Sequence, residues 1–232
     1  NYKIYLYSHK KIKVNPELKL LLLTSGSTGP SKFVMLSKKN IITNIQQICN
    51  YLKISKSDKV IINLPLNYSY GLSIFNTHFL KKGKIILSEN SVMEKKFWEL
   101  FKKFNVNCIY GVPQTYEILK RIKFINEKLD SLKFMAVAGG KIDGKTLKYI
   151  CFLAKKNQFN FFNMYGQTEA SPRIAYASLK NKNQNIASIG KPVKGGRLFI
   201  KDNRGKIINE KNKEGFLYYY GKNVMIGYAK HK

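Results

Sequence analysis

Residues 20–36 read LLLLTSGSTGPSKFVML, so a turn rich in glycine and hydroxyl side chains lies between two short apolar runs, 20–23 and 33–36. We expect the two runs to be strands. Glycines allow backbone N–H groups to approach an anion, hydroxyls add hydrogen bonds, and a lysine adds a point charge. The turn therefore predicts a polyphosphate site, with these candidate residues: Thr24, Ser25, Gly26, Ser27, Thr28, Gly29 and Lys32.

Two other interpretations of this turn exist. A Walker A loop needs the pattern Gly-x-x-x-x-Gly-Lys-Ser/Thr, and here Pro30 and Ser31 separate Gly29 from Lys32, so that class is excluded. A plain hairpin turn is not excluded, because clusters of Gly, Ser, Thr and Pro are usually loops. Composition alone leaves the phosphate site and the plain turn equally open.

Apolar runs and helical patterns alternate downstream of the turn. Ser37 is placed to cap a helix that runs to residue 50, and Asp143 one that runs to residue 154. Further helices are expected at 71–80, 93–104 and 113–122, the last with Pro113 in its first turn and the second with Trp98 and Phe101 in the core. Strands are expected at 59–64, 84–87, 108–111, 132–137 and 160–164. This alternation predicts an α/β fold with a mainly parallel layered sheet.

The pattern changes after about residue 178. Short apolar runs at 189–193, 197–201 and 216–220 are separated by Gly, Asn and Lys turns, and no helical period is visible. We expect residues 1–178 to form the α/β part and residues 179–232 a smaller β-rich part, joined by the polar segment 180–185.

A second motif, MYGQTE at 164–169, directly follows a predicted strand. Ligands of parallel α/β sheets bind outside the carboxyl ends of the strands. Tyr165 offers a ring to stack on a base, Gly166 a close approach, Thr168 a hydroxyl for a phosphate oxygen, and Glu169 a ligand for Mg²⁺. Taken alone, an ordinary loop with a core tyrosine and a surface glutamate explains the segment at least as well.

The two motifs in this order resemble the signatures of the AMP-forming adenylating enzymes, which include acyl- and aryl-CoA synthetases, adenylation domains of peptide synthetases, and firefly luciferase. Shorter segments are similar to the same superfamily: 64–72, 110–113, 138–140, 190–192 and 214–228. Three positions depart from the family pattern. Ser31 and Phe33 stand where the family has Pro and Gly around the lysine, and Tyr68 stands where it has His.

The resemblance implies a layered, mainly parallel α/β fold with a distorted β-barrel portion. It also implies that a carboxylate attacks the α-phosphate of ATP to give an acyl-adenylate and pyrophosphate, and that a thiol, often that of coenzyme A or of carrier-protein phosphopantetheine, then takes the acyl group. Lys32, Thr168 and Glu169 would act in catalysis, Glu169 as the Mg²⁺ ligand. Tyr165, Gly166, Gly139 and Gly140 would bind the nucleotide. The substrate pocket would include Tyr68, Tyr110, Gly111 and Ala138.

The composition is strongly basic, with 42 Lys and Arg against 13 Asp and Glu and a formal net charge of +29. Such a charge is typical of nucleic-acid-binding proteins, and a basic nucleic-acid module is one alternative function. However, four of the basic residues are arginine and 38 are lysine, scattered along the whole chain. We therefore favour solvated lysines and expect no specific nucleic-acid partner.

Other features limit the functional class further. Cys49, Cys108 and Cys151 stand far apart in apolar surroundings, which predicts buried thiols, and the apolar runs are too short to span a membrane. We expect a cytoplasmic protein. His9, His78 and His231 share no spacing, and no catalytic role is assigned to them.

The resemblance also has gaps. Members of the superfamily are longer, and carry a Thr-Gly-Asp motif that binds ribose and a C-terminal domain with a catalytic lysine, none of which is found up to Lys232. We expect a fragment of the large N-terminal domain that binds ATP weakly and adenylates poorly on its own. A non-catalytic remnant of the fold is the remaining alternative.

Overall fold

A seven-stranded sheet forms the centre of the molecule. The computed structural model describes residues 14–24, 32–122, 129–179 and 188–229. The strands lie in the order β4-β3-β5-β6-β7-β8-β9. Their bounds are β3 (Lys59–Ile62), β4 (Lys84–Leu87), β5 (Cys108–Gly111), β6 (Phe134–Val137), β7 (Asn160–Gly166), β8 (Arg173–Ser178) and β9 (Lys191–Pro192).

The pairing of these strands confirms the mainly parallel α/β fold. Strands β4, β3, β5, β6 and β7 are parallel to one another, whereas β8 pairs antiparallel with β7 and β9 pairs antiparallel with β8. Strand β8 is an element that the sequence analysis missed. It begins at a charged residue, Arg173, directly after the motif segment, so its six residues did not stand out as an apolar run.

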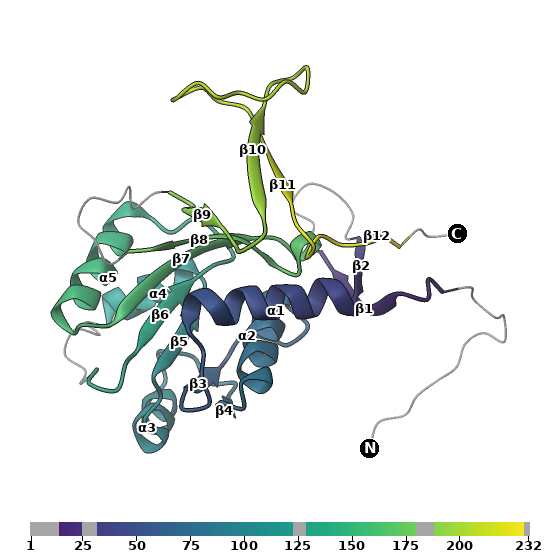
Figure 1. The fold of residues 1–232 in the computed structure, drawn as a ribbon. Helices are drawn as coiled ribbons and strands as arrows, with labels where there is room; N and C mark the ends of the chain where they lie inside the picture. The colour runs from purple at the N-terminus through teal and green to yellow at the C-terminus, as the bar shows by residue number, and fades with distance from the viewer. Residues whose placement is uncertain (1–13, 25–31, 123–128, 180–187, 230–232) are drawn as a thin grey trace.

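Helices cover both faces of the sheet. Alternation along β3 shows how the faces divide: Val60 and Ile62 pack with residues of α1 and α2, while Ile61 packs with residues of α3, α4 and α5. This three-layer arrangement is visible in Figure 1. The helices are α1 (Lys38–Leu52), α2 (Ser69–Leu80), α3 (Lys95–Phe104), α4 (Pro113–Arg121) and α5 (Gly144–Lys156).

The predicted helix starts are confirmed where a specific capping residue was identified. Ser37 caps α1, and its side chain accepts a hydrogen bond from the backbone N–H of Asn40 at 3.1 Å. Asp143 caps α5 and accepts from the backbone N–H groups of Lys145 and Thr146. Pro113 occupies the first turn of α4, where a missing N–H costs nothing.

A separate three-stranded sheet carries the first motif. The two strands that the flanking apolar runs predicted are confirmed as β1 (Leu18–Leu23) and β2 (Phe33–Ser37). They pair as an antiparallel hairpin, and β12 (Gly227–Tyr228) pairs with the other edge of β2. Residues 25–31 of the turn lie outside the described residues. The last strand of the described chain therefore lies beside one of the first.

The predicted strands at 197–201 and 216–220 are confirmed as β10 (Arg197–Lys201) and β11 (Phe216–Tyr220). They pair with each other and project away from the central sheet (Figure 1). At their base, Leu198 and Tyr219 pack against Ala170 and Ile174. The division of the chain at residue 178 and the distorted β-barrel portion stay predictions.

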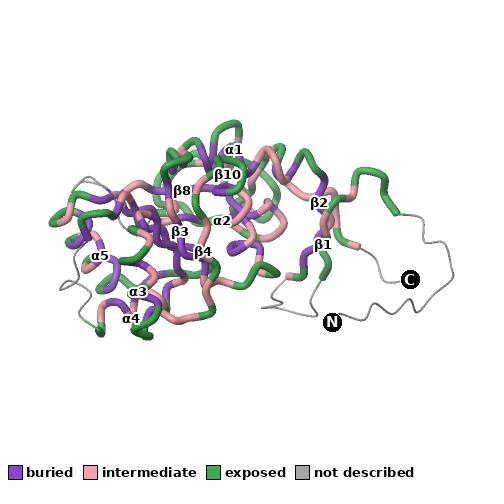
Figure 2. The backbone as a smooth tube through the Cα atoms, turned by 90° about the horizontal axis from the view of Figure 1, so that it is seen from below, coloured by how far each residue is buried: buried purple, intermediate pink, exposed green. Residues whose placement is uncertain are grey.

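Burial is concentrated around the central sheet and decreases toward the β1–β2 hairpin (Figure 2). Phe101 is buried as expected, whereas Trp98 is only partly buried at the edge of the same cluster. Cys49 and Cys108 are buried, Cys151 is half-buried, and all three are free thiols. None of the helices in the described part of the chain is long and apolar enough to cross a membrane.

Candidate functional site

The sequence-predicted residues gather at one edge of the central sheet. Strands β3, β5, β6 and β7 are parallel, so their carboxyl ends lie at the same edge. The segments that follow these ends include Tyr68, the Ala138-Gly139-Gly140 turn and the MYGQTE motif. This is the edge at which parallel α/β sheets bind their ligands.

A cavity of about 510 Å³ opens between the ends of β6 and β7. Four of its lining residues were predicted to bind nucleotide, namely Gly139, Gly140, Tyr165 and Gly166. The side chain of Tyr165 is 37% exposed, so its ring remains available for stacking. The remaining lining residues are Lys141, Ile142, Gly144, Leu147, Asn163, Met164 and Ile189. A mostly apolar cavity with an exposed ring at its rim suits a planar base.

The Tyr68 segment contacts both neighbouring motifs. The hydroxyl of Tyr68 lies against Gly139, whose φ of +86° places it in the left-handed region that favours glycine. The next residue, Ser69, shares a hydrogen bond of 3.1 Å with the hydroxyl of Thr168. The structure thus brings Tyr68, Gly139 and Thr168 to one site.

Substitution of Gly139 tests how tightly this turn is built. We expect Gly139→Ala to lower the free energy of unfolding by about 2 kcal/mol, because the new methyl group would meet the Tyr68 hydroxyl at a positive φ. Gly144→Ala is the matched control, since nothing lies within 4 Å of its added methyl group. Urea denaturation compares the variants, and equal stability of the two would contradict the expectation.

The two described ends of the first motif, Thr24 and Lys32, are joined by hydrogen bonds. The N–H of Thr24 donates to the carbonyl oxygen of Lys32 at 2.9 Å, and the N–H of Lys32 donates to the hydroxyl of Thr24 at 3.0 Å. These bonds close the base of the turn, directly after the last residue of β1 and before the first residue of β2. The other predicted phosphate-site residues, Ser25, Gly26, Ser27, Thr28 and Gly29, lie outside the described residues.

Lys32 and Glu169 meet at a third side chain. The ammonium of Lys32 lies 5.0 Å from the centre of the Tyr228 ring, and the Tyr228 hydroxyl donates to Oε1 of Glu169 at 2.8 Å. This hydrogen bond raises the pKa of Tyr228, with a smaller contribution from burial, so the hydroxyl stays protonated and acts as donor. The lysine of the first motif and the carboxylate of the second thus share one neighbour.

Glu169 belongs to the short 3-10 turn Thr168–Ala170, next to the Thr168 hydroxyl. A carboxylate and a hydroxyl are hard oxygen donors, which suit Mg²⁺. Within residues 14–24, 32–122, 129–179 and 188–229, no group of three or more His, Cys, Asp or Glu side chains could hold a metal by itself. A cation at Glu169 would therefore need further ligands from a bound phosphate or water.

Comparison with known proteins identifies the family. The model of the AMP-binding enzyme family matches residues 8–229. The chain belongs to the AMP-binding enzyme family. Two relatives are the oxalate–CoA ligase of Saccharomyces cerevisiae, 26% identical over 99% of this chain and 44% of its own length, and 4-coumarate–CoA ligase 3 of Oryza sativa, 29% identical over 88% and 38%. The chain thus spans less than half the length of these relatives.

Solved structures agree with this AMP-binding fold. The o-succinylbenzoate CoA synthetase of Bacillus subtilis, in complex with its acyl-adenylate intermediate, superposes with a TM-score of 0.80 at 24% identity, over 90% of this chain and 41% of that one. ATP-bound MatB from Rhodopseudomonas palustris gives a TM-score of 0.77 at 21% identity, over 94% and 42%. At these identities the likeness establishes the fold.

None of the four substrate-pocket residues predicted for this AMP-binding enzyme, Tyr68, Tyr110, Gly111 and Ala138, lines the 510 Å³ cavity. Tyr110 is buried among residues of α1 and α2, and its hydroxyl lies 3.0 Å from Nε2 of His78. Ala138 is 1% exposed, and the space beside Gly111 is filled by Thr115. Tyr110 and Ala138 thus lie in the core, and the assignment of these residues to a substrate pocket stays a prediction.

Two buried polar residues near the site were missed by the sequence analysis. The Asn223 amide donates to the carbonyl oxygens of Ala170 and Arg173, at 2.6 and 2.9 Å, and so holds the turn after Glu169. The Arg173 guanidinium is buried, with its centre 4.2 Å from the centre of the Tyr70 ring, and its Nη2 has no hydrogen-bond partner among the described residues. Arg173 belongs to no motif, and Asn223 lies in segment 214–228 without having been singled out, so only the fold reveals their contacts.

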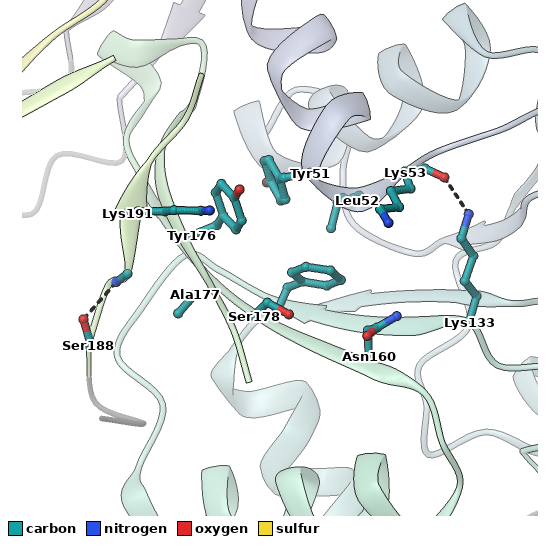
Figure 3. A pocket seen from close by; sticks show the side chains of 12 residues that line it. Tyr51, Leu52, Lys53, Lys133, Asn160, Tyr176, Ala177, Ser178, Ser188 and Lys191 are labelled. Carbon is teal, nitrogen blue, oxygen red and sulfur yellow. Dashed lines mark hydrogen bonds between the residues drawn. The ribbon is translucent and has the colours of Figure 1, made fainter. Parts of the chain in front are cut away.

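A second cavity, of about 630 Å³, lies away from the motifs beside the C-terminal end of α1 (Figure 3). Tyr176 stacks on Tyr51 with ring centres 4.0 Å apart, and the ammonium of Lys191 lies 5.6 Å from the centre of the Tyr176 ring. Lys133 at its edge is paired with Asp58. None of the sequence-predicted site residues lines this cavity, and lysines are so common in the chain that their presence here identifies no ligand.

Proposed function

We propose that this chain is the nucleotide-binding core of an AMP-forming acid–thiol ligase. Such a ligase activates a carboxylic acid with Mg²⁺ and ATP and then forms a thioester with coenzyme A or carrier-protein phosphopantetheine. The observation that carries the proposal is a shared contact. Lys32 of the first motif and Glu169 of the second both contact Tyr228, in a chain that matches the AMP-binding family. One tyrosine thus contacts a cation suited to a phosphate with its ring and a carboxylate suited to a metal with its hydroxyl.

The proposed reaction needs no nucleophile from the protein. An oxygen of the substrate carboxylate attacks the α-phosphorus of ATP, the bond between the α-phosphorus and the bridging oxygen breaks, and the electron pair leaves with pyrophosphate. The Lys32 ammonium neutralises charge on the departing phosphates, and the Thr168 hydroxyl donates to an α-phosphate oxygen. Mg²⁺, when bound, supplies further charge neutralisation, and Glu169 with Thr168 would hold it.

The adenine side of the proposed site rests on the 510 Å³ cavity. Tyr165 would stack on the base, and Gly139 and Gly140 would allow it to lie close to the backbone. Tyr68, with its hydroxyl at Gly139, would stand between nucleotide and acid. The relatives are named for oxalate and 4-coumarate, two very different acids, so they support the shared chemistry and leave the acid open.

Binding of Mg·ATP tests the proposal directly. We expect Lys32→Ala and Glu169→Gln each to weaken binding of Mg·ATP by about tenfold or more, because each removes a charge-assisted contact. Lys211→Ala is the matched control, since it removes the same charge from an exposed lysine beyond the site. Isothermal titration calorimetry on the purified chain measures the affinities.

Two outcomes of this titration would count against the proposal. Equal weakening in Lys32→Ala and Lys211→Ala would mean that the net positive charge of the chain attracts ATP without a defined site. Absence of measurable ATP binding to the unsubstituted chain would favour a non-catalytic remnant. Acid-dependent exchange of pyrophosphate into ATP would support the full activity, and we expect it to be weak for this chain alone.

A further inference from the structure

Backbone hydrogen bonds fix the segment around Tyr228 to strand β2 and to the turn that contains Glu169. In β12 it pairs with Val34 of β2, and the N–H of Ala229 donates to the carbonyl oxygen of Phe33 at 2.8 Å. On the other side, the N–H of Met225 donates to the backbone carbonyl oxygen of Glu169 at 2.8 Å. Residues 225–229 therefore connect the strand that follows the first motif to the turn that carries the second.

Side-chain bonds hold the residues just before this connection. The backbone carbonyl oxygen of Asn223 accepts from the Ser171 hydroxyl at 2.8 Å, and the Asn223 side chain is buried beneath the turn. The Asn40 amide donates to the carbonyl oxygens of Lys222 and Val224, at 2.9 and 2.7 Å. Since α1 also begins directly after β2, the segment 222–229 is fixed to both sides of the site.

We infer that Tyr228 is a positioning residue, which holds the Glu169 carboxylate and the Lys32 ammonium at a fixed separation across the phosphates of a bound nucleotide. This inference rests on the proposed function and adds a residue to it. The Tyr228 hydroxyl occupies Oε1 of Glu169 and leaves the other oxygen for a metal ligand bond. Carboxylate ligands are commonly oriented by such hydrogen bonds. The ring face attracts the Lys32 ammonium through a cation–π contact.

The two halves of this role can be separated by substitution. Tyr228→Phe keeps the ring beneath Lys32 and removes only the hydroxyl that orients Glu169. We expect it to weaken ATP binding in Mg²⁺ about tenfold, the effect typical of losing a partner of a metal ligand, and to leave ATP binding in EDTA unchanged. Tyr228→Leu also removes the ring and should weaken binding under both conditions.

Controls separate this outcome from loss of structure. Tyr220→Phe removes a hydroxyl from an exposed tyrosine of the projecting hairpin and should bind ATP like the unsubstituted chain. The thermal unfolding curve of Tyr228→Phe should coincide with that of Tyr220→Phe. If Tyr228→Leu does not fold, the ATP affinities of Tyr228→Phe in Mg²⁺ and in EDTA still test whether the hydroxyl orients Glu169. Equal affinity of Tyr228→Phe and the unsubstituted chain under both conditions would overturn the inference.

A second measurement is independent of nucleotide binding. The ring carbon that bears the hydroxyl, labelled with ¹³C in tyrosine, reports the hydrogen bond of Tyr228 through its chemical shift at neutral pH, with the Tyr228→Phe spectrum identifying its signal. We expect Glu169→Gln to move this signal, because the hydroxyl loses its bond to a carboxylate. An unchanged signal overturns the inference, whereas the expected change in a chain that binds no ATP supports the contact and rejects the proposed function alone.

Discussion

Replacing Lys133 by methionine should lower the free energy of unfolding by about 3 kcal/mol, because it leaves a buried carboxylate without its counter-charge. The Asp58 side chain is only 1% exposed, and the Lys133 ammonium donates to both of its oxygens, at 2.9 and 2.7 Å. The same ammonium donates to the carbonyl oxygen of Lys53 at 2.7 Å. After substitution, Asp58 would keep hydrogen bonds from the Ser55 N–H and the Asn107 amide.

Urea denaturation of five proteins tests this expectation: the unsubstituted chain, Lys133→Met, Asp58→Leu, their double variant and a control. Lys213→Met is the matched control, since Lys213 pairs with Glu210 at 2.9 Å between two exposed side chains, and its loss should cost less than about 1 kcal/mol. The double variant Lys133→Met/Asp58→Leu removes the buried charge as well, so it should be less destabilised than the sum of the single variants. A loss in Lys133→Met no larger than that in Lys213→Met would show that Asp58 is solvated.

The second large effect is a loss of stability in acid that arises from His78. Its ring is buried in α2, its Nε2 lies 3.0 Å from the Tyr110 hydroxyl, and its Nδ1 has no hydrogen-bond partner among the described residues. Burial lowers the pKa of His78 from 6.5 to about 4, opposed by Asp58 and assisted by Lys133. The folded protein therefore keeps the ring neutral where the unfolded chain would already bind a proton.

The sign of the pH dependence follows from this difference. Between pH 6.5 and about 4 the unfolded state binds more protons at this residue, so stability falls as the pH is lowered through that window. The full pKa shift corresponds to about 3 kcal/mol of the free energy of unfolding. This contribution is fully present above pH 6.5 and fully lost below pH 4. Carboxylates titrate in the lower part of the same range, so a variant is needed to isolate the histidine.

His78→Gln supplies that comparison, because glutamine can still bond to the Tyr110 hydroxyl and does not titrate. We expect the unsubstituted protein to lose stability more steeply than His78→Gln as the pH falls from 7 to 4, as measured by urea unfolding at several pH values. Parallel stability curves for the two proteins would contradict a buried neutral His78. The other histidines, His9 and His231, are present in both proteins and cancel in the comparison.

The sequence predicted elements best where glycine, proline or a capping residue marked a boundary. Strand β4 follows Gly83, α4 begins at Pro113 and α5 begins after Asp143, each as expected. Strand β12 was missed because its two residues, Gly227 and Tyr228, are too few to show the alternation of apolar and polar residues typical of a strand. Only the pairing with β2 defines it. Such pairing depends on contacts between distant segments, which local propensity does not contain.

The candidate site shows the same division between motif and fold. Motif order predicted that Gly139, Gly140, Tyr165 and Gly166 lie together, and they line one cavity. Tyr110 was assigned to a substrate pocket from the family resemblance of segment 110–113, and that assignment stays a prediction. Its place in the core depends on its neighbours in the folded sheet. The shared contact of Lys32 and Glu169 with Tyr228 could not be predicted, because the three residues lie on separate elements.

The pairing of β12 with β2 has a consequence for the order in which the protein is made. The ribosome produces Lys32 and Glu169 before Tyr228, which contacts both, so neither has this neighbour until residue 228 has emerged. Closing so long a loop adds to the entropic barrier and slows this step of folding. The central parallel sheet needs none of these residues, so we expect nascent chains to acquire a folded core well before they acquire a competent nucleotide site.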